Sequence, residues 1–470
     1  MQGTEGSHHR VVDQMNALDA EFLHVEDGVN HMHIGVCAVF EGPCLTEVET
    51  FHLVAAALPH IPRYRQRVRR IPLELGRPIW EDADDFDLAD HLVFTTVPGA
   101  GDDEELQALA ADLMGTELDR RHPLWELTIV DGLNGGRWAM VAKVHHCMVD
   151  GVAGVDLMAT LLAVAPDDGP GPDWEPVGRP SDTRLAASAA ADLARAVVVA
   201  PFWILRQAGH PQRAVHGLRS LASGFGDWAG VLWPTHKSSI TGPVGAERAW
   251  AWAEVDLSEA KAVRAERGGT VNDVVLSAVA NGLRKLLLAR GEDPRSTTIR
   301  TVIPVSVRTE DGVLDNEVSA ELADLPVDIA CPELRYEVVR SETERLKRSH
   351  EVEAGEAATS LAGWVPPPLL AFGTRAAVAL LRRHPQRNVT TVVTNVPGPQ
   401  EPLTAAGRRM LATYPYIPVA LGVRITVGVL SYDGGLFFGV TGDKDSMPDV
   451  ELVAEGIREG IAELHAPIPA

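Results

Sequence analysis

Strand-like and helix-like segments alternate along two long stretches of the chain, and one stretch rich in Pro, Gly and Asp lies between them. In the first stretch, Met32–Gly42 is typical of a buried strand, and Val48–Leu58 has the apolar spacing of a helix. The intervening Pro166–Thr183 has a linker composition, and mostly helical, Ala-rich residues follow it as far as Trp233. The pattern therefore predicts an α/β protein with two strand-rich halves joined by a helical connector.

A chain of 470 residues is longer than one ordinary hydrophobic core supports. We expect a first lobe at 1–165, a linker and helical crossover at 166–240, and a second lobe at 241–470. Further strands are expected in Pro123–Leu133, Arg137–His146, Ala249–Asp256, Thr298–Arg308, Val389–Pro399 and Val423–Asp443. Further helices are expected in Glu104–Leu118, Thr270–Gly291 and Pro448–Leu464.

The formal charge of −23 at pH 7 disfavours a nucleic-acid partner, because phosphates are repelled by an acidic surface. The four cysteines have no CxxC spacing, which predicts reduced thiols. The N-terminus lacks the apolar core of a signal peptide, and no apolar run is long enough to span a bilayer. These features predict a cytoplasmic protein that does not cross a membrane by itself.

The stretch "KVHHCMVDGVAG" places His145, His146 and Asp150 at the end of a predicted strand. Neighbouring side chains of a strand face opposite sides, so both histidines cannot line one cleft, which disfavours a metal site. Two interpretations remain open: a buried polar turn in which Asp150 caps the next helix, or a general base whose imidazole titrates near neutrality. In the second, Gly151 lets the backbone turn where a side chain would clash, and Cys147 is a packed residue.

The motif "HHCMVDG" resembles the HHxxxDG signature of acyl-CoA-dependent acyltransferases related to chloramphenicol acetyltransferase and condensation domains. Seven more motifs occur in order, and together they resemble the bacterial wax ester synthase/diacylglycerol acyltransferase family, in particular its triacylglycerol synthase branch. They are "LDAEFLHVED", "PRYRQRV", "LDRRHPLWE", "VNDVVL", "IPVSVR", "TNVPGP" and "LSYDGGLFFG". Two departures concern the acceptor: Thr241 stands where relatives often have Asn, and Asp315-Asn316 where many have Gly-Asn.

The resemblance implies two chloramphenicol-acetyltransferase-like lobes, each a mixed sheet with flanking helices, and an active-site channel between them. Acyl-CoA would be the co-substrate, and diacylglycerol or a long-chain alcohol the acceptor, with neither a cofactor nor a metal. His146 would be the general base, His145 would support the sheet, and Asp150 and Gly151 would organise the turn. Residues implied at the substrate are Asn272, Asp273, Pro123, Leu124, Trp125 and Arg308, the last also as the partner of Asp150.

Several alternatives stay open. Helix capping by Asn272 and Asp273, and core packing by Pro123, Leu124 and Trp125, are as consistent with the sequence as substrate contact. Arg63, Arg65, Arg67 and Arg69 would lie on one side of a strand at Arg63–Pro72, as a solvated face or as a wall for phosphate.

The apolar Leu361–Arg383 is expected to be a buried helix, with two alternatives: the wall of an acyl tunnel, or a helix on a membrane or lipid inclusion with Arg382 and Arg383 at the headgroups. Acyl transfer to a small polar acceptor, or lipid binding without catalysis, are the alternative functions.

Overall fold

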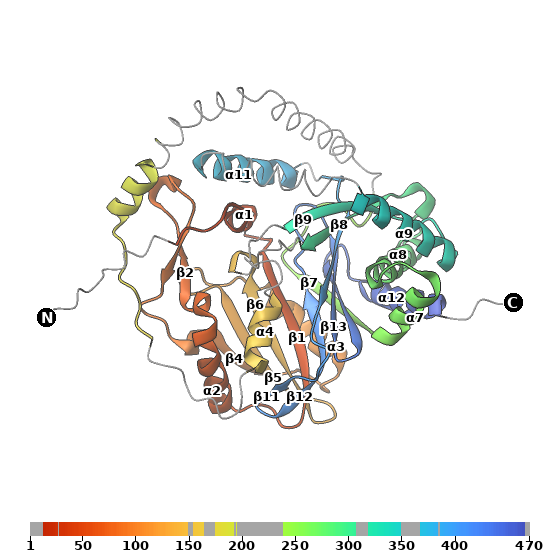
Figure 1. Ribbon diagram of the computed structural model, residues 1–470, viewed down its shortest axis with the longest axis horizontal. Helices are drawn as coiled ribbons and strands as arrows, with labels where there is room; N and C mark the ends of the chain where they lie inside the picture. Colours follow the sequence, from red (N-terminus) through yellow and green to blue (C-terminus); the bar gives the residue numbers. More distant parts are fainter. Residues whose placement is uncertain are drawn as a thin grey trace.

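Two six-stranded sheets with helices packed against them form the body of the protein (Figure 1). The computed structural model describes residues 13–26, 28–148, 154–163, 174–191, 194, 238–306, 318–348, 367–383 and 386–465. Both sheets contain parallel and antiparallel pairs, so the predicted mixed α/β class is confirmed.

The first sheet has the order β11-β12-β1-β6-β5-β4. Its strands are β1 (His33–Glu41), β4 (Leu92–Thr96), β5 (Trp125–Leu133), β6 (Arg137–His145), β11 (Thr404–Ala405) and β12 (Arg408–Tyr416). Helices α2 (Glu47–Ala57), α3 (Asp103–Gly115) and α4 (Gly154–Ala163) accompany it. Eight of the nine residues of β6 are buried, which explains its nearly continuous apolar sequence. Together these elements and α1 (Ala17–Val25) form the first lobe.

The first sheet takes two of its strands from the last third of the chain. The strand β12 pairs antiparallel with β1, in register from Gly35 opposite Tyr416 to Phe40 opposite Met410. It also crosses closely over β14 (Gly435–Asp443), because a Cβ added to Gly439 would lie 1.8 Å from the carbonyl oxygen of Pro415. The last third of the chain is therefore tied to the first sheet by main-chain hydrogen bonds, and the two sheets pack closely against each other at β12.

The second sheet has the order β7-β14-β13-β10-β8-β9. Its strands are β7 (Arg248–Asp256), β8 (Ile299–Ser306), β9 (Val318–Leu325), β10 (Thr391–Pro397), β13 (Ile425–Tyr432) and β14 (Gly435–Asp443). Helices α7 (Leu257–Arg267), α8 (Val271–Ala289), α9 (Pro332–Arg348) and α12 (Glu451–His465) complete the second lobe. The axes of α8 and α12 approach closely because a Cβ on Gly456 would lie only 2.6 Å from the Cα of Gly282.

The strand predicted at Arg63–Pro72 is shorter than expected. Residues Pro62–Arg65 form a 3₁₀ turn, and only β2 (Gln66–Arg69) is extended, paired with β3 (Ile79–Asp82). Proline at the start of the turn fixes its φ and favours the tighter conformation. Both Arg67 and Arg69 form ion pairs with the buried carboxylate of Glu81. The charges of Arg67 and Arg69 are therefore paired within the protein. This pairing gives no support to the alternative that the arginines of this segment bind a phosphate group.

Helix α11 (Pro367–Arg383) lies over α1 (Ala17–Val25), outside both sheets (Figure 1). Its side chains at Ala371 and Val378 are buried, whereas Phe372 is 73% exposed and Leu380 is 59% exposed. The expectation of an ordinary buried helix was wrong, because one apolar face of α11 has no protein against it within the described residues. Among the described helices, none combines the length and apolar character needed to cross a membrane.

The predicted domain boundaries stay a prediction. Residues 174–181 have no regular secondary structure and 182–191 are helical, in agreement with a linker that leads into a helix. Most of the expected crossover lies outside the described residues.

Candidate active site

The two adjacent histidines lie where β6 ends, and their rings have different partners. The ring of His145 is buried: its Nδ1 accepts a hydrogen bond from the main-chain N–H of Cys147 at 3.1 Å. The next residues, His146–Met148, form a 3₁₀ turn, and the ring of His146 stacks on Phe22 of α1 with centroids 3.8 Å apart. Strand alternation predicted this divergence, and we refer to residues 145–148, which include the predicted catalytic base, as the catalytic turn.

The side chain of His146 is half-buried, and its Nδ1 is buried without a hydrogen-bond partner among the described residues. Burial lowers the pKa of this imidazole to about 4, because charge is poorly solvated there. The ring is therefore neutral at pH 7 and has a lone pair with which to accept a proton.

A carboxylate that the sequence did not single out anchors the catalytic turn from the other side. The side chain of Glu26 is 3% exposed, and its Oε2 lies 3.3 Å from the Nε2 of His145. Since the Nδ1 of His145 accepts a hydrogen bond, its Nε2 carries the proton and donates to Glu26. The same oxygen is paired with the guanidinium of Arg120, and Oε1 accepts from the N–H of Met32 at 3.3 Å.

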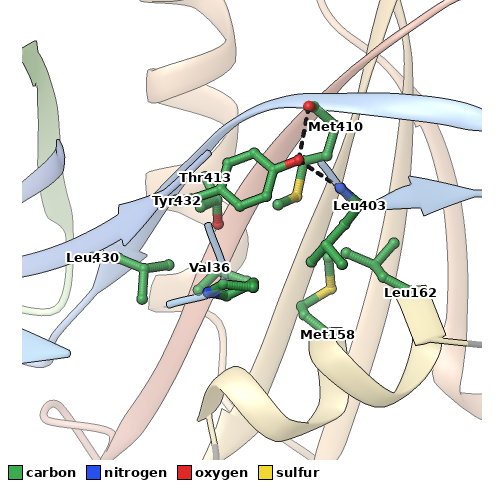
Figure 2. A pocket seen from close by; sticks show the side chains of 9 residues that line it. Val36, Met158, Leu162, Leu403, Met410, Thr413, Leu430 and Tyr432 are labelled. Atoms are coloured by element: carbon green, nitrogen blue, oxygen red, sulfur yellow. Dashed lines mark hydrogen bonds between the residues drawn. The ribbon is translucent and has the colours of Figure 1, made fainter. Parts of the chain in front are cut away.

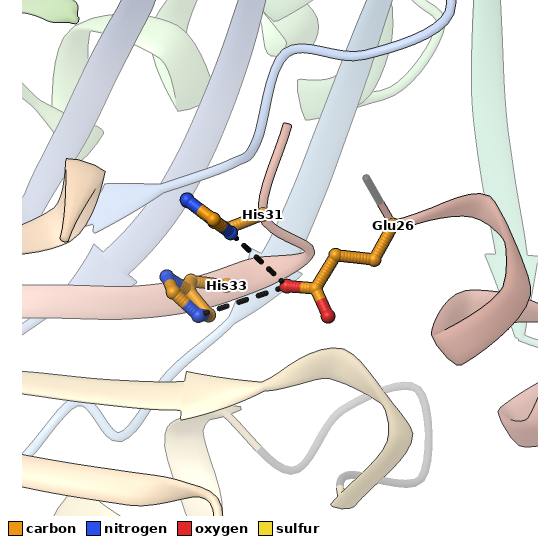
Figure 3. A group of neighbouring side chains, drawn as sticks. All are labelled: Glu26, His31 and His33. Atoms are coloured by element: carbon orange, nitrogen blue, oxygen red, sulfur yellow. Dashed lines mark ion pairs between the residues drawn. The ribbon is translucent and has the colours of Figure 1, made fainter. Parts of the chain in front are cut away.

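Two more histidines face the other oxygen of Glu26 (Figure 3). The Nδ1 of His31 lies 3.4 Å and the Nε2 of His33 4.0 Å from Oε1. Burial by itself raises the pKa of Glu26, but hydrogen bonds from His145 and His31 and the charge of Arg120 outweigh it and hold the pKa below its usual range. We call Glu26, His31, His33, His145 and Arg120 the Glu26 cluster.

The Glu26 cluster also offers possible metal ligands. Ligand atoms of Glu26, His31 and His33 all lie within 4.8 Å of one another. The Nδ1 of His33 donates to the carbonyl of Met114 at 3.2 Å, so its Nε2 presents a lone pair. The cations of Arg120 and Lys143 lie close by and oppose a metal ion there. The expectation that the protein holds no metal stays a prediction.

Asn272 and Asp273 begin helix α8. Asp273 is buried, and its carboxylate accepts hydrogen bonds from the N–H of Thr270 and the hydroxyl of Thr343, both at 2.7 Å. The capping interpretation of Asp273 is thus confirmed. Asn272 is half-buried, and its Oδ1 accepts a hydrogen bond from the side chain of Asn395 at 3.2 Å. The motifs "VNDVVL" and "TNVPGP" are therefore in contact. Contact of either residue with substrate stays a prediction.

The segment of Pro123, Leu124 and Trp125 is buried. The indole of Trp125 donates to the carbonyl of Tyr64 at 2.8 Å and stacks on His91, as expected for core packing. The carbonyl of Leu124 accepts from the N–H of His145 at 2.9 Å, which places the segment beside the catalytic turn. A role in the acyl path stays a prediction.

Three predicted site residues, Asp150, Gly151 and Arg308, lie outside the described residues. The four cysteines are free, as predicted. Cys147 is 1% exposed and burial raises the pKa of its thiol, so it is unsuited to act as a nucleophile.

Described residues line two cavities. The smaller, of about 30 Å³, lies between Met158 and Leu162 of α4 and the strands of the last third of the chain (Figure 2). There the hydroxyl of Tyr432 donates to the carbonyl of Met410 and accepts from the N–H of Leu403. This space is about that of one water molecule, so it does not accommodate an acyl chain. The larger cavity, of about 190 Å³, lies beneath α11.

The fold itself is shared with two groups of known proteins. The wax ester synthase/diacylglycerol acyltransferase from Marinobacter aquaeolei VT8 has a TM-score of 0.68 at 23% identity, covering 96% of this chain and 98% of that chain. The first condensation domain of the CDA synthetase has a TM-score of 0.58 at 16% identity, covering 97% of both chains. These likenesses define the class of fold, in which two lobes each contain a mixed sheet.

The sequence comparisons are more specific. The wax ester synthase/diacylglycerol acyltransferase catalytic domain matches residues 15–275, and the WS/DGAT C-terminal domain matches residues 314–465. The probable diacylglycerol O-acyltransferase tgs1 of Mycobacterium tuberculosis is 36% identical, with 97% of this chain and 96% of that protein covered. A putative diacylglycerol O-acyltransferase of Mycobacterium bovis gives the same figures. This chain belongs to the wax ester synthase/diacylglycerol acyltransferase family, as the ordered motifs predicted.

Proposed function

We propose that this chain transfers a long-chain fatty acyl group from acyl-CoA to diacylglycerol, and also to long-chain alcohols. One observation carries the proposal: His146, whose pKa burial lowers to about 4, directly follows β6 in an intact HHxxxDG motif. The relatives named as diacylglycerol O-acyltransferases are 36% identical over almost the whole chain, which favours diacylglycerol over a small polar acceptor.

In the proposed mechanism His146 accepts the proton of the acceptor hydroxyl as that oxygen attacks the thioester carbonyl. The C–S bond then breaks, and the imidazolium returns the proton to the departing CoA sulfur. No covalent intermediate with the enzyme forms, and no metal or other cofactor takes part. His145 supports the turn, and Asp150 and Gly151 would organise its far side, with Arg308 as the partner of Asp150.

The test is an assay of thiol release from palmitoyl-CoA with dioleoylglycerol, hexadecanol or a panel of small amines and sugars. We expect release that depends on dioleoylglycerol and forms triacylglycerol in equal amount. Release with the small polar acceptors alone would contradict the proposed acceptor. Tight binding of lipid without any turnover would instead indicate a protein that only binds lipid.

The low pKa of His146 predicts how the rate depends on pH. A base must be unprotonated, so the rate is lost as pH falls through its pKa. Because burial lowers this pKa to about 4, we expect kcat/KM to change less than about twofold between pH 8 and pH 5.5 and to fall below that. Samples returned to pH 7 control for unfolding. Half-maximal loss near pH 6.5, where an unperturbed histidine titrates, would contradict this picture.

We further propose that α11 rests on a lipid surface, either the inner face of the membrane or a lipid inclusion. Phe372, Ala376 and Leu380 are exposed and recur at four-residue spacing, so they form one apolar stripe. The exposed Arg383 follows at the end of the same face, at a suitable position for a headgroup phosphate.

Replacing Phe372 by Glu should detach the protein from lipid. Burying one such side chain contributes about 2 kcal/mol, so Phe372→Glu should weaken binding to phosphatidylcholine vesicles by about 30-fold in a flotation assay. Leu334→Glu on α9 is the matched control, since Leu334 is also an exposed apolar residue, at 49%, but lies in the second lobe. Equal losses in both variants would contradict the role of α11.

A further inference from the structure

The larger cavity lies where the two lobes meet beneath α11, and four separate segments of the chain enclose it. All ten residues that line its volume of about 190 Å³ are uncharged. They are Val25, Asn30, Gly242, Pro243, Val244, Val378, Leu381, Ala420, Leu421 and Gly422.

The lining mixes neutral polar and aliphatic groups. Asn30 contributes an amide, and Gly242 and Gly422 have only backbone atoms to offer. Val378 and Leu381 contribute aliphatic side chains from α11. This chemistry matches the esters, hydroxyl and first methylenes of a neutral glycerolipid, but it does not neutralise the phosphates of CoA.

The backbone on one side of the cavity is held in an unusual conformation. Leu421 has a φ of +52°, in the left-handed region that a branched side chain rarely adopts, and Gly422 follows with a φ of +87°. A non-glycine residue in that conformation is strained, and such residues concentrate at ligand sites. The N–H of Gly242 donates to the carbonyl of Gly422 at 3.0 Å, so the strained segment is fixed against the opposite wall.

One helix separates this cavity from the outer apolar stripe. Val378 and Leu381 line the cavity, while Phe372 and Leu380 point away from the body of the protein. Only the helix α11 therefore lies between the cavity and a lipid bound at the outer stripe. Such a lipid could reach the cavity by passing around the edge of this one helix.

On its other side the cavity adjoins the helix that contacts the catalytic turn. Val25, at the end of α1, lines the cavity, and the next residue is Glu26, which binds His145. Phe22, on the same helix, stacks on the ring of His146. The cavity and the proposed base thus contact the same short helix.

We propose that this cavity binds the glycerol diester portion of the acceptor and presents its free hydroxyl to His146. The inference rests on the proposed function, which it deepens by assigning a site to the diacylglycerol. The water-soluble acyl-CoA would reach His146 from another side, since the cavity has no cationic side chain for its phosphates.

The variant that tests this site is Val378→Trp, which fills the cavity. With dioleoylglycerol as acceptor, we expect KM to rise by at least tenfold, while KM for palmitoyl-CoA changes less than twofold. Ala379→Trp is the matched control, because Ala379 is the next residue and is exposed on the outer face. It should leave both constants within twofold. A rise in KM for palmitoyl-CoA instead, or no change with either substrate, would overturn the assignment.

A labelling experiment on the unmodified protein separates this inference from the proposed function. Diacylglycerol with a diazirine near its ester groups, irradiated without acyl-CoA, should label peptides containing 242–244 or 420–422. Excess dioleoylglycerol should compete, and Val378→Trp should reduce labelling at least fivefold. Labelling elsewhere overturns the site even if triacylglycerol forms. Labelling at these peptides in a protein that makes no triacylglycerol supports the site while the proposed reaction fails.

Discussion

His146→Ala should lower the rate of acyl transfer by about 10²–10⁴-fold, the usual contribution of a positioned general base. The ring is a neutral imidazole directly after β6, held against Phe22, and its Nδ1 has no hydrogen-bond partner among the described residues. His145 donates its proton to Glu26, and the thiol of Cys147 is buried with a raised pKa. The measurement is thiol release from palmitoyl-CoA with dioleoylglycerol at pH 7.

The control for this variant is Met148→Leu on the same turn. Met148 is buried, and leucine has a similar volume, so a rate within about threefold of the unmodified protein is expected. Thermal unfolding of both variants checks that the fold is retained. If His146→Ala kept more than a tenth of the rate, His146 would not be the base.

The sequence was a good guide to local elements and a poor one to the pairing of distant strands. The alternation predicted β1, β5, β6 and the hairpin of β13 and β14, because each has a continuous or alternating apolar pattern. Strand β12 was not predicted, since Pro415 lies within it and proline lacks the N–H that a central strand needs. Pro415 is tolerated in β12 because β11 pairs only with Arg408 and Arg409. Pro415 therefore lies beyond the end of β11, where no strand on that side needs its N–H.

For the site, strand alternation was enough to predict that His145 and His146 diverge. The Glu26 cluster was missed because its key contact joins residues 119 positions apart. One signal was present: His31 precedes His33, the first residue of β1, by two positions, and the two rings stack with their centroids 5.3 Å apart. Two histidines spaced two positions apart, five and seven positions after a glutamate, indicate that these side chains pair with one another when they are buried.

Glu26→Gln should lower kcat by about 10²-fold while KM for palmitoyl-CoA stays within threefold. The amide keeps the shape of the carboxylate but loses its charge, which leaves Arg120 without its partner and weakens the hydrogen bond from His145. The Nδ1 of His145 accepts from Cys147, so a shift of this ring moves the turn that carries His146. A displacement of about 1 Å at a reacting group is enough for a loss of this size.

Loss of the charge of the buried Glu26 also destabilises the protein, by about 1–3 kcal/mol, so stability has to be separated from positioning. Glu81→Gln provides that separation, because Glu81 is a buried carboxylate of the first lobe paired with Arg67 and Arg69, away from the catalytic turn. Urea unfolding should show comparable losses for the two variants, whereas only Glu26→Gln should lose kcat at temperatures where both are folded. Equal losses of kcat would mean that Glu26 supports the fold alone, and an unchanged kcat in Glu26→Gln would mean that His145 holds the turn without it.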